Sequence, residues 1–416
     1  DGSVKKFNKI NDKHMAFVLF ALCWAAYFTS YIGRLNYSSA MPEMLRLSVL
    51  DKSQAGFISM SYFFAYGIGQ LINGFLGDKM HPRKMIFTGL FLAGVMNIVM
   101  GFLNNFGTMA VFWCTNGFLQ SMIWPPILRI FAEMLNEETR VRYSIHITST
   151  MALGTLTSYV LSAIMLELFG WRAAFFAAAI VMCGVAVVFQ IRFRVVEQYA
   201  SEHGEPHGDE RGKDGEETSV PFSKVLIGSG LFMILIPVIV HGVLKDGVTS
   251  WVPTYIQEIF HTSSSFSILI TTVLPIVNLT GAYAAQFMYQ KFFRKQEIRT
   301  VAFFFVIATG ALLGLWKFGD VSVVVTVVLL GIITASMMAV NTLVVNLLPL
   351  HFVKMGRAAT VSGFLNSMAY LGTAISTFTI GIMVESSGWN RTIFGWFIMT
   401  AAAMVICFLL YKKKFE

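Results

Sequence analysis

The sequence predicts an all-α membrane protein with twelve transmembrane helices, arranged as two pseudo-symmetric six-helix bundles. Three features of the chain lead to this prediction: its composition, the length of its apolar runs and a polar break near its middle. Of its 416 residues, 56% are hydrophobic and 13% are charged, and the mean hydropathy is +0.65. A water-soluble core cannot use so much apolar sequence, so the bilayer is expected to be a solvent for this chain.

Twelve apolar runs are each long enough to cross a bilayer, which takes about 20 residues of helix. The runs are continuous rather than short and alternating, which excludes a transmembrane β-barrel. The expected spans are residues 15–41, 53–78, 84–104, 106–134, 143–169, 172–193, 223–251, 264–290, 299–318, 321–349, 357–384 and 390–411.

A polar, glycine-rich and charge-dense segment at residues 195–222 interrupts this pattern. Such a segment buries too little apolar surface to fold, so we interpret it as a cytoplasmic linker. It separates an N-terminal bundle, residues 1–194, from a C-terminal bundle, residues 223–416, and each half contains six expected spans.

Two short patterns recur in the two halves. Arg34 and Lys245 are each followed by a proline eight residues later, and Gly170-Trp-Arg matches Gly388-Trp-Asn. Equivalent spans then run in the same direction, so the halves are expected to be parallel repeats about an axis along the membrane normal. A cavity on that axis would be shared by both repeats.

The basic residues predict the orientation of the chain. Of the 31 Lys and Arg residues, 23 fall on the segments that lie inside when both termini are cytoplasmic, 5 fall on outer loops and 3 fall within spans. This is a strong positive-inside signal. It accounts for the net charge of +8 without a nucleic-acid partner.

The paired cations Arg34 and Lys245 predict an anion site. A charge within the bilayer costs about 2.5–3.5 kcal/mol on insertion scales, so an unused one is rarely kept. Arginine offers a planar fork to two phosphate oxygens, and lysine acts as a compact point charge. The alternative is that both side chains reach to the outer interface, since Arg34 lies 19 residues past Met15, about 28 Å along a helix.

Several motifs resemble the major facilitator superfamily, and within it the organophosphate:phosphate antiporters, which include glycerol-3-phosphate and hexose-6-phosphate transporters. The resemblance covers essentially the whole chain and implies the fold of that superfamily. In that family, basic residues on helices 1 and 7 bind the phosphate, which assigns this role to Arg34 and Lys245. The motifs are Tyr31-Ile-Gly-Arg-Leu-Asn-Tyr-Ser-Ser-Ala-Met-Pro42, Asp78-Lys-Met-His-Pro-Arg83, Gln120-Ser-Met-Ile-Trp-Pro-Pro126 and Trp251-Val-Pro-Thr-Tyr255.

The resemblance implies that a phosphate ester is exchanged for inorganic phosphate. Two other functions stay open: a proton-coupled symporter of carboxylates or sugar acids, and a transporter-like sensor of a phosphate ester. Gly33 stands where such symporters usually carry an acid, whereas Asp246 or His241 could carry a proton. Asp246 could also neutralise Lys245, or point away, since adjacent helical residues diverge by about 100°.

Further polar residues are candidates for lining the substrate cavity, and packing between helices is the alternative for each. His241 lies one turn before Lys245 and could sense pH. The other candidates are Tyr31, Asn36, Tyr37, Asn341, Asn366 and Tyr370.

A charged cluster is expected to form an inner gate, and its alternative is a basic anchor at the membrane surface. Its members are Asp78, Arg83, Lys84 and Arg129. The pair Pro125-Pro126 is expected to bend the helix that carries Arg129.

The chain has no enzyme signature. It lacks the Gly-Lys-Ser/Thr loop that cradles nucleotide phosphates, and its four cysteines have no metal-ligand spacing. We therefore expect no catalytic residue, no cofactor and no metal, with a small anion and the lipid bilayer as partners. The resemblance also implies a monomer.

Overall fold

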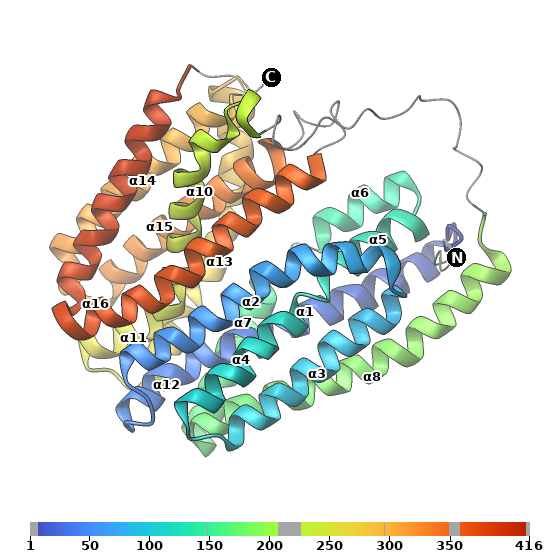
Figure 1. Cartoon of the computed structure of the whole chain (residues 1–416), viewed down its shortest axis with the longest axis horizontal. Coiled ribbons are helices and arrows are strands. Elements are labelled where there is room, and N and C mark those ends of the chain that lie inside the picture. The colour runs from blue at the N-terminus through green and yellow to red at the C-terminus, as the bar shows by residue number, and fades with distance from the viewer. Residues whose placement is uncertain (1–6, 148, 207–225, 295, 349–357, 413–416) are drawn as a thin grey trace. The chain divides into compact units, whose positions relative to one another are not determined.

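The computed structural model describes residues 7–147, 149–206, 226–294, 296–348 and 358–412. Within helices it describes only the backbone of residues 75, 77–79, 132, 137, 141, 144, 145, 346, 358–360 and 362. These parts of the chain are almost entirely helical (Figure 1).

By backbone packing the chain divides into two compact units. The first contains residues 1–40 and 68–214, and the second contains residues 41–67 and 215–416. The segment 41–67, which the sequence places in the N-terminal bundle, thus packs with the second unit. There Lys52 Nζ lies 3.0 Å from Glu258 Oε2.

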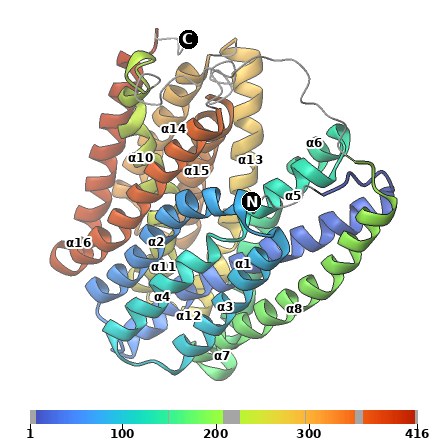
Figure 2. The ribbon, with the colours of Figure 1, turned by 45° about the vertical axis from the view of Figure 1, so that its right-hand side comes forward.

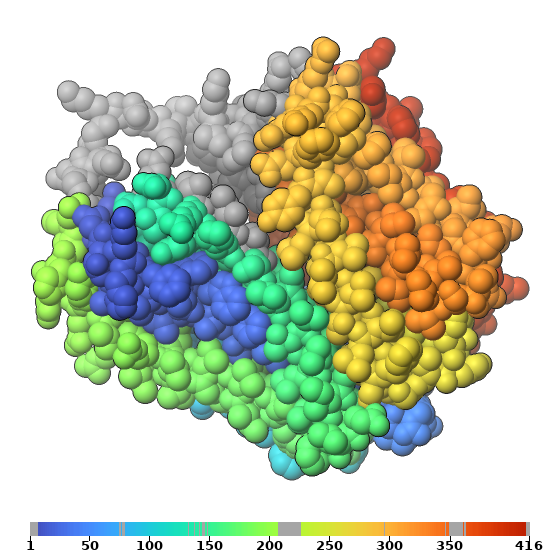
Figure 3. All heavy atoms as spheres, turned by 180° about the vertical axis from the view of Figure 1, so that it is seen from behind, coloured from blue at the N-terminus to red at the C-terminus, as the bar shows by residue number. Residues whose placement is uncertain are grey.

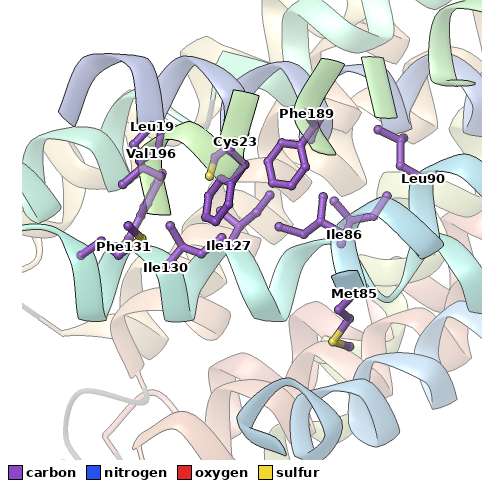
Figure 4. Close-up of a cluster of buried hydrophobic side chains, with 14 of the residues drawn as sticks. Leu19, Cys23, Met85, Ile86, Leu90, Ile127, Ile130, Phe131, Phe189 and Val196 are labelled. Carbon is purple, nitrogen blue, oxygen red and sulfur yellow. The ribbon is translucent and has the colours of Figure 1, made fainter. Parts of the chain in front are cut away.

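The first unit is built from helices of the N-terminal half. They are α1 (Lys13–Arg46) and α2 (Lys52–Lys79), both shared with the second unit, and α3 (Pro82–Phe102), α4 (Phe106–Gln120), α5 (Trp124–Met134), α6 (Glu137–His146), α7 (Ser149–Phe169) and α8 (Trp171–His203). Helices α3 and α8 lie side by side along their length, as both ribbon views show (Figures 1 and 2). A core of aliphatic and aromatic side chains joins α1, α3, α5 and α8, with Leu19, Ile86, Ile127 and Phe189 at its centre (Figure 4).

The second unit contains the helices of the C-terminal half. They are η1 (Leu231–Ile234), α10 (Leu235–Gly242), η2 (Val243–Gly247), α11 (Val248–Phe260), α12 (Ser264–Thr271), α13 (Val273–Phe287), η3 (Met288–Phe292), α14 (Glu297–Phe318), α15 (Val323–Asn341), η4 (Thr342–Leu347) and α16 (Ala358–Leu409). Helix α13 packs against α15, and its gold atoms are continuous with those of η3 on the face shown in Figure 3.

Ten helical stretches in the described parts of the chain are long and apolar enough to cross a membrane. Two differences in local structure separate this number from the twelve expected spans. The expected span 106–134 is broken into α4 and α5, because Pro125 and Pro126 lack the backbone N–H that would continue the ladder of hydrogen bonds. The last stretch, Gly363–Leu409, covers most of the two expected spans 357–384 and 390–411, with a turn between them at Gly388.

The glycine that separates the last two spans of each half has the same unusual backbone conformation. Gly170 has φ 82° and ψ 176°, and Gly388 has φ 77° and ψ 172°. A side chain is strained at such φ values, so glycine is required at both turns. In each half, therefore, the Gly-Trp pattern marks the same turn.

The segment that the sequence assigns to the linker begins as helix. Helix α8 continues to His203, and Val196 and Ala200 are each only 1% exposed because they lie on one face, four residues apart, and pack into the core. Residues 207–222 of the expected linker lie outside the described residues.

Candidate functional site

Arg34 lies on α1, partly buried in the first unit, with an aromatic side chain beneath it. The guanidinium carbon is 5.4 Å from the centroid of the Tyr31 ring, close enough for a cation–π contact. Tyr31 is 6% exposed, and its hydroxyl oxygen lies 3.3 Å from that of Tyr27. Tyr31, one of the predicted site residues, therefore supports the Arg34 side chain directly.

The backbone just before Arg34 is held by a cluster of buried amide side chains. The carbonyl oxygen of Gly33 accepts hydrogen bonds from Asn97 Nδ2 at 3.3 Å, Asn116 Nδ2 at 3.2 Å and Gln120 Nε2 at 3.0 Å. These donors come from α3 and α4, and all three residues are buried. Buried hydrogen bonds of this kind are expensive to lose, so they fix α1 in register at the position of Arg34.

Side chains of neighbouring helices lie close to the backbone at Gly33. A Cβ atom there would clash with Met182 Sδ and lie 3.1 Å from Asn97 Nδ2. A larger residue at position 33 would therefore require the Met182 side chain to move.

Asn36 and Tyr37 are buried against neighbouring helices of the first unit, each 1% exposed. Asn36 Nδ2 donates to Asn97 Oδ1 at 2.7 Å, which joins it to the amide cluster. The Tyr37 ring lies 5.3 Å from the Trp113 ring. These contacts favour helix packing over lining a cavity, and a direct role in binding stays a prediction for both.

Lys245 lies in the second unit on η2, a π-helical segment, and forms an ion pair with the next residue. Its Nζ atom is 2.8 Å from Asp246 Oδ2, and the two side chains are 12% and 31% exposed. Adjacent residues of a regular α-helix do not face each other. The wider turn of a π-helix rotates less per residue, which brings the two side chains together. Of the two orientations the sequence left open for Asp246, the pairing one is observed.

Two hydroxyl groups of the next turn donate hydrogen bonds to backbone carbonyl oxygens of the π-helical segment. Thr249 Oγ1 donates to the Lys245 carbonyl at 2.5 Å, and Ser250 Oγ donates to the Asp246 carbonyl at 2.7 Å. Bonds from a hydroxyl to the carbonyl four residues earlier also bend helices. These two hydroxyl contacts accompany the π-helical geometry at Lys245, and sequence reasoning did not single out Thr249 or Ser250.

Helix α10 and η2 approach α16 very closely through glycine. Gly242 meets the Ala369 carbonyl so tightly that a Cβ atom would clash with its oxygen. The Gly242 carbonyl accepts a hydrogen bond from Thr373 Oγ1 at 2.9 Å. Small residues at a helix contact let backbones pack without side chains between them.

His241 is fully buried one turn before Lys245. Its Nδ1 lies 2.8 Å from the Val238 carbonyl oxygen, and its Nε2 lies 3.1 Å from Asn341 Oδ1. The ring therefore joins α10 to the end of α15, which is the helix-packing alternative for both His241 and Asn341. Substrate contact and proton coupling by His241 stay predictions.

Asn366 and Tyr370 lie one turn apart on α16, and both are partly exposed. The Tyr370 ring lies 5.0 Å from the Tyr66 ring, which belongs to the same unit. These two residues share a helix face, as their spacing of four requires.

Three of the four expected gate residues are described with their side chains, and all lie in the first unit. Arg83 Nε is 3.3 Å from Glu197 Oε2. Arg129 pairs with Glu133 Oε1 at 2.7 Å and donates to the Met80 carbonyl at 3.2 Å, at the end of α2. Lys84 is exposed, and the side chain of Asp78 lies outside the described residues.

His81 adds a titratable group to this cluster, outside the membrane spans. Its Nε2 lies 3.4 Å from Glu197 Oε1. Burial, followed by the positive charges of Arg83, Lys84 and Arg129, lowers the pKa of His81 below its usual 6.5. Glu133 and Glu197 were missed from the sequence, although Arg129 and Glu133 have the spacing of a helical ion pair.

No group of three or more His, Cys, Asp or Glu side chains in the described part of the chain could hold a metal ion. The described cysteines carry no disulfide. The polar side chains nearest Gly33 are amides, whereas the described cations Arg83, Arg129 and Lys245 each pair with a carboxylate.

Comparison with known proteins agrees with this architecture. The family model of the Major Facilitator Superfamily matches residues 23–377, and the chain belongs to that family. It is thus a multi-pass membrane transporter rather than an enzyme. A solved structure of a bacterial homolog to the human lysosomal transporter Spinster, in an inward-facing and unoccupied conformation, superimposes with a TM-score of 0.80 at 14% identity, covering 97% of this chain and 98% of that one.

Within the superfamily, the relatives are those of the organophosphate:phosphate antiporter family. The chain is 24% identical over 412 residues to a probable hexose phosphate transport protein of Chlamydia muridarum, covering 94% of this chain and 89% of the relative. It is 22% identical over 400 residues to the membrane sensor protein UhpC of Salmonella typhimurium, covering 93% and 88%.

Proposed function

We propose that this protein is a secondary transporter that exchanges a phosphate ester, such as a hexose phosphate, for inorganic phosphate. The observation that carries the proposal is the repeat-related pair of cations, Arg34 and Lys245. Each lies partly buried on the equivalent helix of its half. The hexose phosphate transport protein among the relatives supports a phosphorylated substrate.

In this mechanism Arg34 and Lys245 bind one anion from opposite repeats. Binding places the negative charge of the substrate against both cations, which lowers the cost of bringing the halves together around it. Rocking of one half against the other then alternates access, as in transporters built from repeats. Arg83 and Arg129, with Asp78 and Lys84, take part in the inner gate, and the protein works as a monomer in the cell membrane with both termini in the cytoplasm.

The test is radiolabelled phosphate uptake into proteoliposomes preloaded with phosphate. We expect exchange that external glucose 6-phosphate competes and that an imposed pH gradient alone does not drive. Uptake that needs a pH gradient and no internal phosphate would instead identify the proton-coupled symporter, with Asp246 or His241 as the proton carrier.

A sensor is the second candidate, because a relative of nearly equal coverage is a membrane sensor protein. A sensor needs to bind its ligand but not to move it. Binding of glucose 6-phosphate to the purified protein, together with phosphate flux no faster than in protein-free vesicles, would favour the sensor over the transporter.

A further inference from the structure

The first unit has an apolar groove on its surface, between α1 and α8. The groove has a volume of about 320 Å³ and is lined by Leu22 and Ala25 of α1 and by Ile180, Gly184 and Val188 of α8, among other apolar residues. The atoms of the two helices, blue and yellow-green, adjoin on the face shown in Figure 3. Both helices also contribute to the buried core of this unit. The groove is therefore a surface feature of two helices that pack together in the interior.

Small residues leave this groove open. Gly184 has no side chain, and a Cβ atom there would meet nothing within 4 Å. Across from it, Ala25 contributes only a methyl group. Ile180 and Val188 lie one turn before and one turn after Gly184 on the same helix face, and they are 74% and 54% exposed. An empty gap between such apolar walls forfeits van der Waals contacts, so an apolar occupant is favoured.

The length and depth of the groove match one leaflet of a bilayer. On α8 it runs from Ile180 to Val188, about 12 Å along the helix. The hydrocarbon layer of one leaflet is about 15 Å thick, half of the bilayer core. Helix α8 begins at Trp171, about 14 Å before Ile180, so the groove lies in the second half of the span. It therefore extends in the direction of an acyl chain within a single leaflet.

A cation lies at the end of the groove where a lipid headgroup is expected. Arg192 follows Val188 by one turn on the same helix face, and its side chain is exposed. No ion pair or hydrogen bond joins this side chain to another described residue. The nearest carboxylate along α8 is that of Glu197, which pairs with Arg83. An apolar groove that ends at such a cation is complementary to a lipid with a negatively charged headgroup.

We propose that this groove binds one acyl chain of an anionic phospholipid, whose phosphate contacts Arg192. The acyl chain fills the space beside Gly184 and restores the contacts that the missing side chain forfeits. The Arg192 guanidinium forms charge-assisted hydrogen bonds to the phosphate oxygens. A zwitterionic phospholipid has the same chain and phosphate but carries an additional positive charge, so Arg192 favours the anionic lipid.

The experiment is native mass spectrometry of the purified full chain in detergent, with equal amounts of phosphatidylglycerol and phosphatidylethanolamine that carry identical acyl chains. The measured quantity is the fraction of protein that retains each lipid. Gly184→Leu fills the groove, and Arg192→Gln removes its cation. The matched controls are Gly310→Leu on α14, where a Cβ atom also meets nothing within 4 Å, and Arg194→Gln, an exposed arginine of α8 whose charge interacts with that of Glu197.

We expect the wild-type protein to retain phosphatidylglycerol about fivefold more than phosphatidylethanolamine, as one basic residue at a lipid surface suggests. Arg192→Gln should lose this preference, Gly184→Leu should retain less of both lipids, and the two controls should behave as the wild-type protein does. Thermal unfolding verifies that each variant is folded. If Gly184→Leu does not fold, Arg192→Gln decides alone, because its side chain is exposed.

Three results would overturn the inference. The first is equal retention of the two lipids by the wild-type protein. The second is an unchanged preference in Arg192→Gln, or unchanged retention in folded Gly184→Leu. The third is a dimer of the wild-type protein that Gly184→Leu abolishes, since the groove would then belong to a contact with a second copy of the chain.

Discussion

The helices that carry Arg34 and Lys245 occupy equivalent places in the two repeats but are supported in opposite ways. Around Arg34, the helix is regular, and three buried side-chain amides donate hydrogen bonds to the carbonyl oxygen of Gly33. Around Lys245, the helix widens into a π-helical segment, and the lysine is paired with its own counter-ion. Arg34 therefore lies on a regular helix held by three side-chain donors, and Lys245 lies on a π-helical segment.

This difference suggests a division of labour between the repeats. The amide cluster positions the Arg34 guanidinium, which has a rigid fork and needs accurate placement to bind two oxygens at once. Lys245 needs less directional accuracy, and π-helical segments often occur at functional sites where a helix must adjust. We infer that adjustment on substrate binding is concentrated in the second half.

The largest effect is expected from removing either cation. Arg34→Ala and Lys245→Ala should each reduce phosphate exchange by roughly 30-fold to more than 1,000-fold, since losing one partner of a buried charged contact costs about 2–5 kcal/mol. Exchange is measured in proteoliposomes and normalised to folded protein. Arg46→Ala is the control on α1, because Arg46 is 60% exposed and pairs with Glu43. Phosphate exchange retained in Arg34→Ala would show that Arg34 does not bind the transported anion.

A clash at the contact between Gly242 and Ala369 should disturb the C-terminal half, which carries Lys245. Gly242→Ala places a methyl group against the Ala369 carbonyl, and a backbone atom cannot move aside cheaply. We expect a loss of about 1–3 kcal/mol in stability, seen as a lower thermal unfolding temperature, together with reduced exchange. The control is Gly363→Ala on α16, where a Cβ atom meets nothing within 4 Å. Equal unfolding temperatures and equal exchange in the two variants would show that α10 and α16 can move apart at Gly242 without loss.

Removing one donor of the amide cluster around Gly33 should destabilise the N-terminal half, which carries Arg34. Gln120→Ala should destabilise the protein by about 1–3 kcal/mol and raise the KM for phosphate, because the Gly33 carbonyl loses a buried donor and Arg34 loses its register. Thr334→Val is the matched control, since it removes a buried bond to Asn278 of 2.6 Å in the second unit. We expect both variants to be less stable and only Gln120→Ala to change KM. If Gln120→Ala lowers stability but leaves KM unchanged, the amide cluster serves helix packing and does not position Arg34.

The smallest effect concerns His81 and pH. Its pKa is lowered in the folded protein, so the unfolded chain binds more protons near and below pH 6.5, and stability falls as the pH drops through that region. Thermal unfolding between pH 5 and pH 8 should therefore show a slightly weaker acid sensitivity in His81→Gln than in the wild-type protein. Identical pH profiles would mean that burial and the neighbouring cations do not lower the pKa of His81.

Much of this architecture could be predicted from the sequence, because its signals are local. Apolar runs, basic loops and the two Gly-Trp turns each lie within a short stretch of chain, and Gly170 and Gly388 share the same backbone conformation. The helix break before Pro125 is local as well. The pairing of segment 41–67 with the second unit has no such signal, since its contacts are with residues about 200 or more positions away.

The contacts that hold Arg34 and Lys245 in place could not be predicted, because they join residues far apart in the sequence or depend on helix geometry. The side chains that donate to the Gly33 carbonyl come from α3 and α4, so no sequence pattern near Arg34 predicts them. The π-helical segment at Val243–Gly247 likewise has no distinctive residue pattern, because Thr249 and Ser250, which donate to its carbonyls, look ordinary in a sequence. As a result, the ion pair of Lys245 and Asp246 stayed one of two alternatives until the structure was known.

The central claim is that Arg34 and Lys245 bind one and the same anion. A double-mutant cycle tests it directly: glucose 6-phosphate binding is measured for the wild-type protein, Arg34→Ala, Lys245→Ala and the double variant, all verified as folded. The account predicts strong coupling, with the double variant little weaker than either single variant. Losses that simply add would mean that the two cations act at separate places, and this would contradict the account.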